Sequence, residues 1–269
     1  MRKLLLLALL IGCFVKTDQA AEIVAGQTEV SIYSAYVWRG QVLYDTPVWQ
    51  PAQNLYLHLG EDGEYGTLKA RVWASFAIAP NKAPYKFASM SIIDETVSYT
   101  KTFFDCLDTE FGHIGYQFPT RRYATIRDTD ELLAGVRWRN PYLTPSVYVY
   151  WDYGPNGAPD NDSLYFDFAF THPFQLSEDF TFVSGAGFGF GNEAYNRSYS
   201  GDTLKHATFN NFHLDFGLWY KITSFLKAGL NCSYFFNLDH EVRESNYCVE
   251  DEYKSGGILR GGFQIIATY

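Results

Sequence analysis

The sequence predicts an all-β protein, a closed, antiparallel, up-and-down transmembrane β-barrel of about twelve strands. About twelve segments alternate apolar and polar residues, which is the period of a strand with one apolar and one polar face. The connections between these segments are alternately long and short. Beyond the extreme N-terminus, no stretch approaches the roughly 18 to 20 consecutive apolar residues that a membrane-spanning helix needs. The aromatic content of 18% suits the interfacial girdles of a membrane barrel.

Residues 1–21 are expected to form an export signal peptide. They have a positively charged start, then an apolar run, then polar and small residues. The barrel then occupies residues 22–269 as a single domain. Two alternatives stay open: cleavage near Ala25, and lipidation of Cys13, whose preceding residues resemble a lipoprotein signal box.

The expected strands follow from the alternation and from the turn residues that bound it. They span 29–39, 48–59, 66–79, 89–102, 107–118, 129–139, 145–153, 162–173, 179–191, 206–221, 224–237 and 256–269. The pattern is clearest in 206–221, where Phe212, Leu214 and Phe216 share one face while His213 and Asp215 share the other. In the strand 89–102, either parity turns Asp94 or Glu95 toward lipid, so a β-bulge is expected there.

An even number of strands places both ends of the barrel on one side, and the short connections are expected on that same side. This is the layout of outer-membrane barrels. The last strand ends in apolar residues at every second position and a terminal aromatic, Tyr269, which resembles the signal read by the barrel assembly machinery. The alternative is that this pattern is that of an ordinary last strand in any β protein. The expected location is the bacterial outer membrane, with its lipid and lipopolysaccharide as partners and the assembly machinery as a partner during biogenesis.

The charge balance excludes nucleic acid as a partner. The chain has 21 basic and 30 acidic residues, and residues 1–21 contain three basic and one acidic. The remainder therefore carries 18 basic and 29 acidic residues, a net charge of −11, which repels phosphate backbones.

The cysteines give no obvious disulfide. Cys232 has the parity of lipid-facing residues, Cys248 lies in the longest connection, and Cys106 lies by a short turn. A bond between Cys232 and Cys248 requires a bulge that turns Cys232 away from lipid, and this alternative stays open.

A family resemblance lies in the first hairpin, in the stretch Ser-Ala-Tyr-Val-Trp-Arg-Gly-Gln at 34–41, followed by Pro47. It resembles the opening strand and loop of the TorF-like family of outer-membrane proteins and porins, as does Trp-Ala-Ser at 73–75. The resemblance covers about the first fifty residues after the signal peptide. The resemblance implies a barrel that is exported from the cytoplasm, and it identifies no active-site residue in this chain.

Charged residues on the expected inward parity are the candidate pore lining. Basic residues fall near the short-connection end of their strands, acidic residues from the middle to the other end, and two arginines toward the outer half. In that order they are Lys69, Arg71, Arg137, Arg139 and Lys227; Glu131, Asp152, Asp167 and Asp215; and Arg39 and Arg260, with His213 beside Asp215. This predicts an acidic outer lumen above a basic inner constriction. In the alternative, these charges pair across the interior and close it.

The function these patterns favour is a porin-like channel for passive diffusion of small hydrophilic solutes or ions. The first alternative is a sealed structural or adhesive barrel. The second is an outer-membrane lipid hydrolase, for which His213 and Asp215 are the nearest candidate pair, although residues two apart on a strand are separated by about 6 to 7 Å of backbone rise. No catalytic residue, metal site or cofactor is expected, and the oligomeric state is left open.

Overall fold

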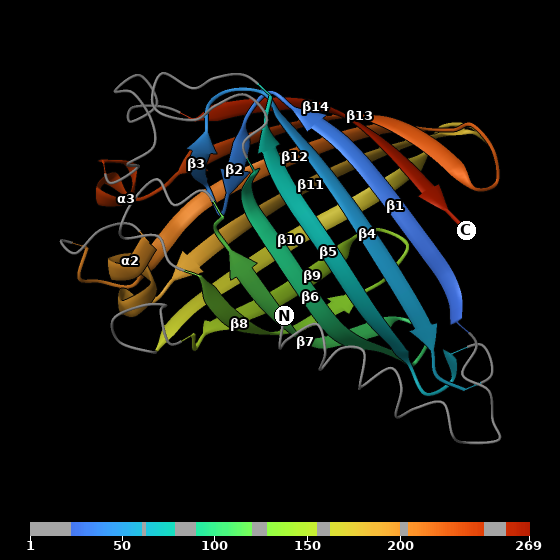
Figure 1. Ribbon diagram of the computed structural model, residues 1–269, viewed down its shortest axis with the longest axis horizontal. Helices are drawn as coiled ribbons and strands as arrows, with labels where there is room; N and C mark the ends of the chain where they lie inside the picture. The colour runs from blue at the N-terminus through green and yellow to red at the C-terminus, as the bar shows by residue number, and fades with distance from the viewer. Residues whose placement is uncertain are drawn as a thin grey trace.

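A computed structural model describes residues 23–60, 63–78, 90–119, 128–154, 162–199, 204–244 and 257–269. Twelve strands form a closed antiparallel barrel, as predicted (Figure 1). The barrel closes where β1 (Ile23–Tyr33) pairs on one side with β14 (Ile258–Thr268) and on the other with β4 (Val48–His58). The export signal and the Cys13 lipidation site lie outside the described residues, as does Cys248.

The remaining barrel strands follow one another around the wall. They are β5 (Thr67–Ala77), β6 (Met90–Phe103), β7 (Leu107–Gln117), β8 (Thr129–Trp138), β9 (Thr144–Asp152), β10 (Ser163–Gln175), β11 (Phe180–Gly191), β12 (Thr208–Lys221) and β13 (Leu226–Asn237). Four further elements do not belong to the wall: β2 (Tyr36–Trp38), β3 (Gln41–Tyr44), α2 (Glu193–Tyr199) and α3 (His240–Glu244). None of the helices in the described residues is long and apolar enough to cross a membrane.

The two ends of the barrel differ. Figure 1 shows β2, β3, α2 and α3 gathered at one end, while the C-terminus lies at the other. We call the first the loop end, and the second, which carries the short connections, the turn end. This is the expected layout of long and short connections.

Both predicted boundaries of the first strand are wrong. It was expected at 29–39, but β1 begins at Ile23, because the backbone of Gly26 exchanges hydrogen bonds of 2.6 and 2.9 Å with Tyr269 and so extends the barrel seam. At the loop end β1 stops at Tyr33, and the chain then turns back on itself as the hairpin β2–β3. Arg39 and Gly40 form the two-residue turn of this hairpin with φ values of 50° and 80°. Positive φ at both central residues is typical of a type I′ turn.

The outward face of the wall is apolar. Cross-strand partners share a face, and outward side chains such as Phe216, Leu230 and Phe263 are at least 40% exposed. Cys232 is opposite Phe216 on this face and is free, so the structure does not turn it inward. This face is the surface that lipid would cover.

The bulge expected at Asp94 and Glu95 is not there. The register between β5 and β6 shifts opposite Ser75, and from Ile92 onward it is continuous. Asp94 is opposite Trp73 on the inward face, and Glu95 is opposite Val72 on the outward face.

Aromatic rings on the inward face lie flat against the wall over glycines of the neighbouring strand. Four such cross-strand pairs are Gly135 with Tyr148, Gly187 with His213, Gly229 with Trp219 and Gly262 with Tyr33. A Cβ added at any of these glycines would collide with the partner ring. The absence of that Cβ lets the rings lie along the wall instead of across the lumen.

Two adjacent glycines of β14 test this packing. Gly262→Ala must displace the Tyr33 ring at the seam, whereas a Cβ at Gly261 meets nothing within 4 Å. We expect Gly262→Ala to lower the free energy of unfolding by about 1–3 kcal/mol, as overpacking does, and Gly261→Ala to leave it unchanged or to raise it slightly. Urea unfolding of the refolded barrel measures both. Equal effects of the two substitutions would contradict the packing described.

Candidate functional site

The hairpin β2–β3 lies inside the barrel at the loop end. One side packs on the wall formed by β4 to β7, in a buried cluster of Tyr36 and Tyr44 with Val48, Ala77, Ile92 and Tyr116. The other side packs on β13 and β14, where Ala35, Val37 and Val42 contact Ile258 and Phe235. A hairpin with barrel wall on both sides fills the lumen between them. We call residues 35–44 the plug.

The plug ends in a buried ion pair. Arg39 donates two hydrogen bonds to the Glu131 carboxylate on β8, Nη1 to Oε1 at 2.8 Å and Nη2 to Oε2 at 2.7 Å. The side chains are 9% and 1% exposed. Tyr116 also donates to Glu131 at 2.9 Å, and Asn211 on β12 donates to the Arg39 carbonyl at 2.9 Å. The tip of the plug is therefore fixed to two separate parts of the wall.

Aromatic rings surround the Arg39 guanidinium. Its central carbon lies 4.6 Å from the ring centre of Trp38, 4.4 Å from Tyr150, 4.6 Å from Tyr165 and 5.7 Å from Tyr195. Burial opposes the charge, but the Glu131 carboxylate more than offsets this, and the pKa of Arg39 is raised above its ordinary value. Arg39 is thus a permanent cation held by one carboxylate and several ring faces.

Helix α2 covers the plug from the loop end. Tyr195 is buried and contacts Tyr165, and the carbonyl of Tyr199 accepts a hydrogen bond of 2.8 Å from Gln41 in β3. The Tyr199 hydroxyl donates to Asp152, which also accepts from the wall. The plug, α2 and the β8–β9 wall are therefore joined by polar contacts.

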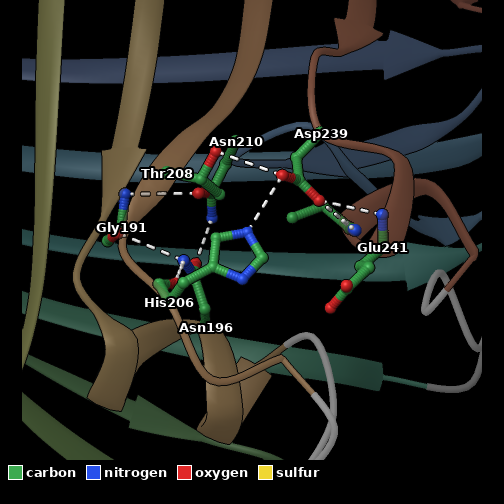
Figure 2. Close-up of polar contacts among 8 residues, drawn as sticks. Gly191, Asn196, His206, Thr208, Asn210, Asp239 and Glu241 are labelled. Atoms are coloured by element: carbon green, nitrogen blue, oxygen red, sulfur yellow. Dashed lines mark hydrogen bonds and ion pairs between the residues drawn. The ribbon is translucent and has the colours of Figure 1, made fainter.

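A second polar network joins the two loop helices to the wall (Figure 2). Asn196 of α2 donates to the carbonyls of Gly191 and His206 at 3.1 and 2.9 Å. Asp239, the residue before α3, accepts from the amide groups of Glu241 and Val242 at 2.8 and 3.2 Å and lies 3.2 Å from His206 Nε2. Asp239 thus caps α3 and binds the connection that follows α2.

Solvent reaches inward side chains that lie outside the plug. On the inward face of β10 and β12, Asp167 and Asp215 flank His213, whose Nδ1 lies 2.6 Å from Asp215 and whose Nε2 lies 3.7 Å from Asp167. The Asp167 and Asp215 side chains are 33% and 42% exposed, against 1% for Glu131. Side chains are therefore packed around the plug, while solvent reaches these carboxylates.

The residues predicted to line the outer part of the lumen lie in three different environments. Glu131 and Asp152 are buried at the plug, so the alternative of charges paired across the interior describes this part of the lumen. Asp167, His213 and Asp215 line the solvated part. Arg260 donates to Ser233 at 3.1 Å and lies over the Tyr33 ring. Arg39, expected on the barrel wall, lies instead at the tip of the plug, because the chain leaves the wall after Tyr33.

The basic residues expected near the turn end are on the inward register there, but they have acidic neighbours. Lys69, Arg71 and Arg137 are inward by their cross-strand pairs, Lys227 lies over the Trp219 ring, and Arg139, just past β8, pairs with Asp108 at 3.1 Å.

Several inward carboxylates were missed by the sequence reasoning, among them Glu29 and Glu110. Glu29 accepts a hydrogen bond of 2.9 Å from Asn54, and Glu110 accepts one of 3.2 Å from Tyr148. The lumen near the turn end therefore carries both signs of charge. Glu29 could have been recognised from its parity with Ser31 in β1.

Within the described ranges, no group of three or more histidine, cysteine, aspartate or glutamate side chains is placed to hold a metal ion.

Comparisons with known proteins give structural neighbours only, since no family model and no curated protein matches the sequence. An outer membrane channel from Pseudomonas putida F1 superposes with a TM-score of 0.52 at 11% identity, covering 94% of this chain and 98% of that one. The KdgM porin gives 0.50 at 9% identity, with 91% and 99% covered. LpxR from Salmonella typhimurium gives 0.52 at 8% identity, with 90% and 99% covered. These structural similarities show that the chain shares the fold of outer-membrane barrels, and at identities this low they show the fold alone.

The Arg39–Glu131 pair should dominate the stability of the plug. Arg39→Met leaves a buried carboxylate uncompensated, which costs about 3–5 kcal/mol, while Arg39→Met combined with Glu131→Leu should recover part of that loss. The pair of Arg139, which is 51% exposed, and Asp108 is the control, because Arg139→Met should cost at most about 1 kcal/mol. Urea unfolding in lipid vesicles measures all of these variants. A single Arg39→Met variant as stable as the wild type would contradict the burial of this pair.

The capping of α3 should weaken in acid. Partial burial raises the pKa of Asp239, but hydrogen bonds from His206 and from the amide groups of Val242 and Glu241 outweigh this and lower it. The stabilisation is therefore complete above the ordinary carboxyl pKa of about 3.9 and is lost as the pH falls through the lowered value. Hydrogen-exchange protection factors of Glu241 and Val242 should fall in that range. In Asp239→Ala they should be low at every pH.

Proposed function

We propose that this protein is an outer-membrane channel for passive diffusion of small hydrophilic solutes or ions, and that the plug closes its loop end. One observation carries the proposal: inward charged side chains are reached by solvent, while the plug region is buried. These two features support a water-filled pathway and a closure in one lumen.

The solvated lumen favours a channel over a barrel that is filled throughout. Small eight-stranded barrels are packed with side chains, whereas wide porins are open. Twelve strands lie between these sizes, and here several inward rings lie over glycines of the neighbouring strand. A sealed structural barrel has no evident need to keep Asp215 hydrated.

The sealed structural or adhesive barrel is the second candidate. The observation that favours it is the plug itself, whose two apolar clusters and buried ion pair hold it firmly in the lumen. In that case the loop end, with α2 and α3, would be the working surface toward lipopolysaccharide.

We do not propose an enzyme. His213 and Asp215 face the lumen, where membrane lipid does not reach. A second pair, His113 and Asp130, lies 3.2 Å apart on the outward face, but the residue opposite Asp130 on β7 is Gly115, which offers no nucleophile.

The proposal includes an outer-membrane location, membership of the TorF-like family and insertion by the barrel assembly machinery. Export through a signal peptide, insertion by the barrel assembly machinery and contact with lipopolysaccharide are what a barrel of this architecture requires. The stretch that resembles the TorF-like family, 34–41, makes up most of the plug. Members of that family that contain this stretch are then expected to have the same plug.

The direct test is to remove the plug. Tyr33 and Val48 are cross-strand partners, so residues 34–47 can be replaced by a four-residue turn that joins β1 to β4. In planar bilayers we expect discrete conductance steps from this variant, and rarer or smaller steps from the wild type. Heat-modifiable gel migration shows that each protein has folded. A folded but silent variant would support the sealed barrel.

The same recordings report the charge of the pathway. Because both signs line the lumen, the plug-free variant should discriminate weakly between cations and anions. Adding Arg71→Gln and Arg137→Gln should move the reversal potential toward cation preference, and Asp167→Asn with Asp215→Asn should move it toward anion preference. Unchanged potentials in both sets would mean that these residues do not line the pathway.

A further inference from the structure

The carboxyl group of Asp94 has one buried oxygen without a hydrogen-bond partner, and the residue as a whole is partly exposed. It lies on the inward face of β6, and its Oδ1 is buried and accepts no hydrogen bond from any described residue. Buried polar atoms in folded proteins are nearly always hydrogen-bonded, so each exception needs an explanation.

The surface beneath the plug surrounds this carboxyl group. The cross-strand partners of Asp94 are Trp73 on β5 and Tyr116 on β7. Both belong to the apolar cluster on which the plug packs, and the ring of Tyr36 from β2 lies 5.5 Å from that of Trp73. The plug thus lies over the wall next to Asp94, whose Oδ1 is buried.

The charged and titratable groups that face Asp94 do not neutralise it. They are Arg71 on β5, Arg39 and Tyr36 on the plug, Tyr116 on β7 and Glu131 on β8. Arg39 is already bound by Glu131 through both of its terminal nitrogens. No ion pair joins Arg71 to Asp94 in the described ranges. The burial of Oδ1 without a hydrogen bond disfavours a charge on this carboxyl group.

We propose that Asp94 makes the plug responsive to pH, so that the plug stays in the lumen while Asp94 is protonated and leaves when Asp94 ionises. A neutral carboxyl group is tolerated beneath Tyr36, whereas a carboxylate there lacks the hydrogen bonds that water would supply. Departure of the plug hydrates it. The closed state therefore binds this proton more tightly than the open state, and by linkage a rise in pH favours opening.

A cysteine in the plug reports its departure without any conductance. Val42→Cys is placed in a chain whose cysteines 106, 232 and 248 are serine, and Ser224→Cys at an exposed turn is the reference. The ratio of their maleimide labelling rates removes the pH dependence of the thiol reaction itself. We expect this ratio to rise between pH 5 and 8, approaching tenfold per pH unit where one proton is coupled.

The variants decide whether Asp94 is the group responsible. In Asp94→Asn the labelling ratio should stay low at every pH, since the neutral amide mimics the protonated carboxyl. Asp105→Asn is the matched control and should keep the wild-type profile. Asp105 is exposed in a turn with a φ of 56°, which asparagine tolerates. A flat profile with Asp94 intact, or the same rise in Asp94→Asn, would overturn the proposal.

Only the conductance readout of this proposal rests on the proposed function. In bilayers the wild type should open more often as the pH rises, and the plug-free variant should be indifferent to pH. A pH-dependent labelling ratio in a protein that never conducts would reject the channel and keep the switch. Conductance with a pH-independent ratio would reject the switch and keep the channel.

Discussion

The buried guanidinium of Arg39 is the constraint on which the arrangement of the lumen depends. A cation at the tip of a hairpin can enter a barrel only where a carboxylate receives it, because an unpaired buried charge is costly. Glu131 supplies that carboxylate through two hydrogen bonds, and four rings complete the surroundings. With the tip fixed, the two sides of the hairpin lie against two different parts of the wall, and their apolar residues define the two buried clusters.

In the rest of the lumen, charged side chains are in contact with solvent instead of being buried in ion pairs. Where the plug does not reach, rings fold over cross-strand glycines and leave charged side chains in contact with solvent, as for His213 over Gly187 beside Asp215. The same strands therefore carry a packed region and a hydrated region. This combination distinguishes the protein both from a filled barrel and from an open pore.

Periodicity alone was enough to predict the wall. Alternation gave the strand count, the closure and most boundaries, because each strand has one face toward lipid and one toward the lumen. The plug was missed because Tyr36, Val37 and Trp38 continue the first expected strand as an apolar run, and periodicity does not reveal which surface covers a strand. The turn at Arg39 and Gly40 was the available signal. The partner of Arg39 could not be found from sequence, since Glu131 is 92 residues away and is brought near only by barrel closure.

The connectivity explains how such a plug can be movable. Tyr33 and Val48 face each other across β1 and β4, so the wall is complete without residues 34–47. The hairpin pairs with itself and forms a sheet of its own, separate from the barrel. Its departure would leave the hydrogen-bond ladders of the wall intact and would break mainly side-chain interactions with the wall and α2. Those interactions are unequal: the Arg39 pair resists release at the tip, while Asp94 lies without a hydrogen bond under the base. In the proposed switch, the plug is therefore held firmly at the paired Arg39 and less firmly next to Asp94.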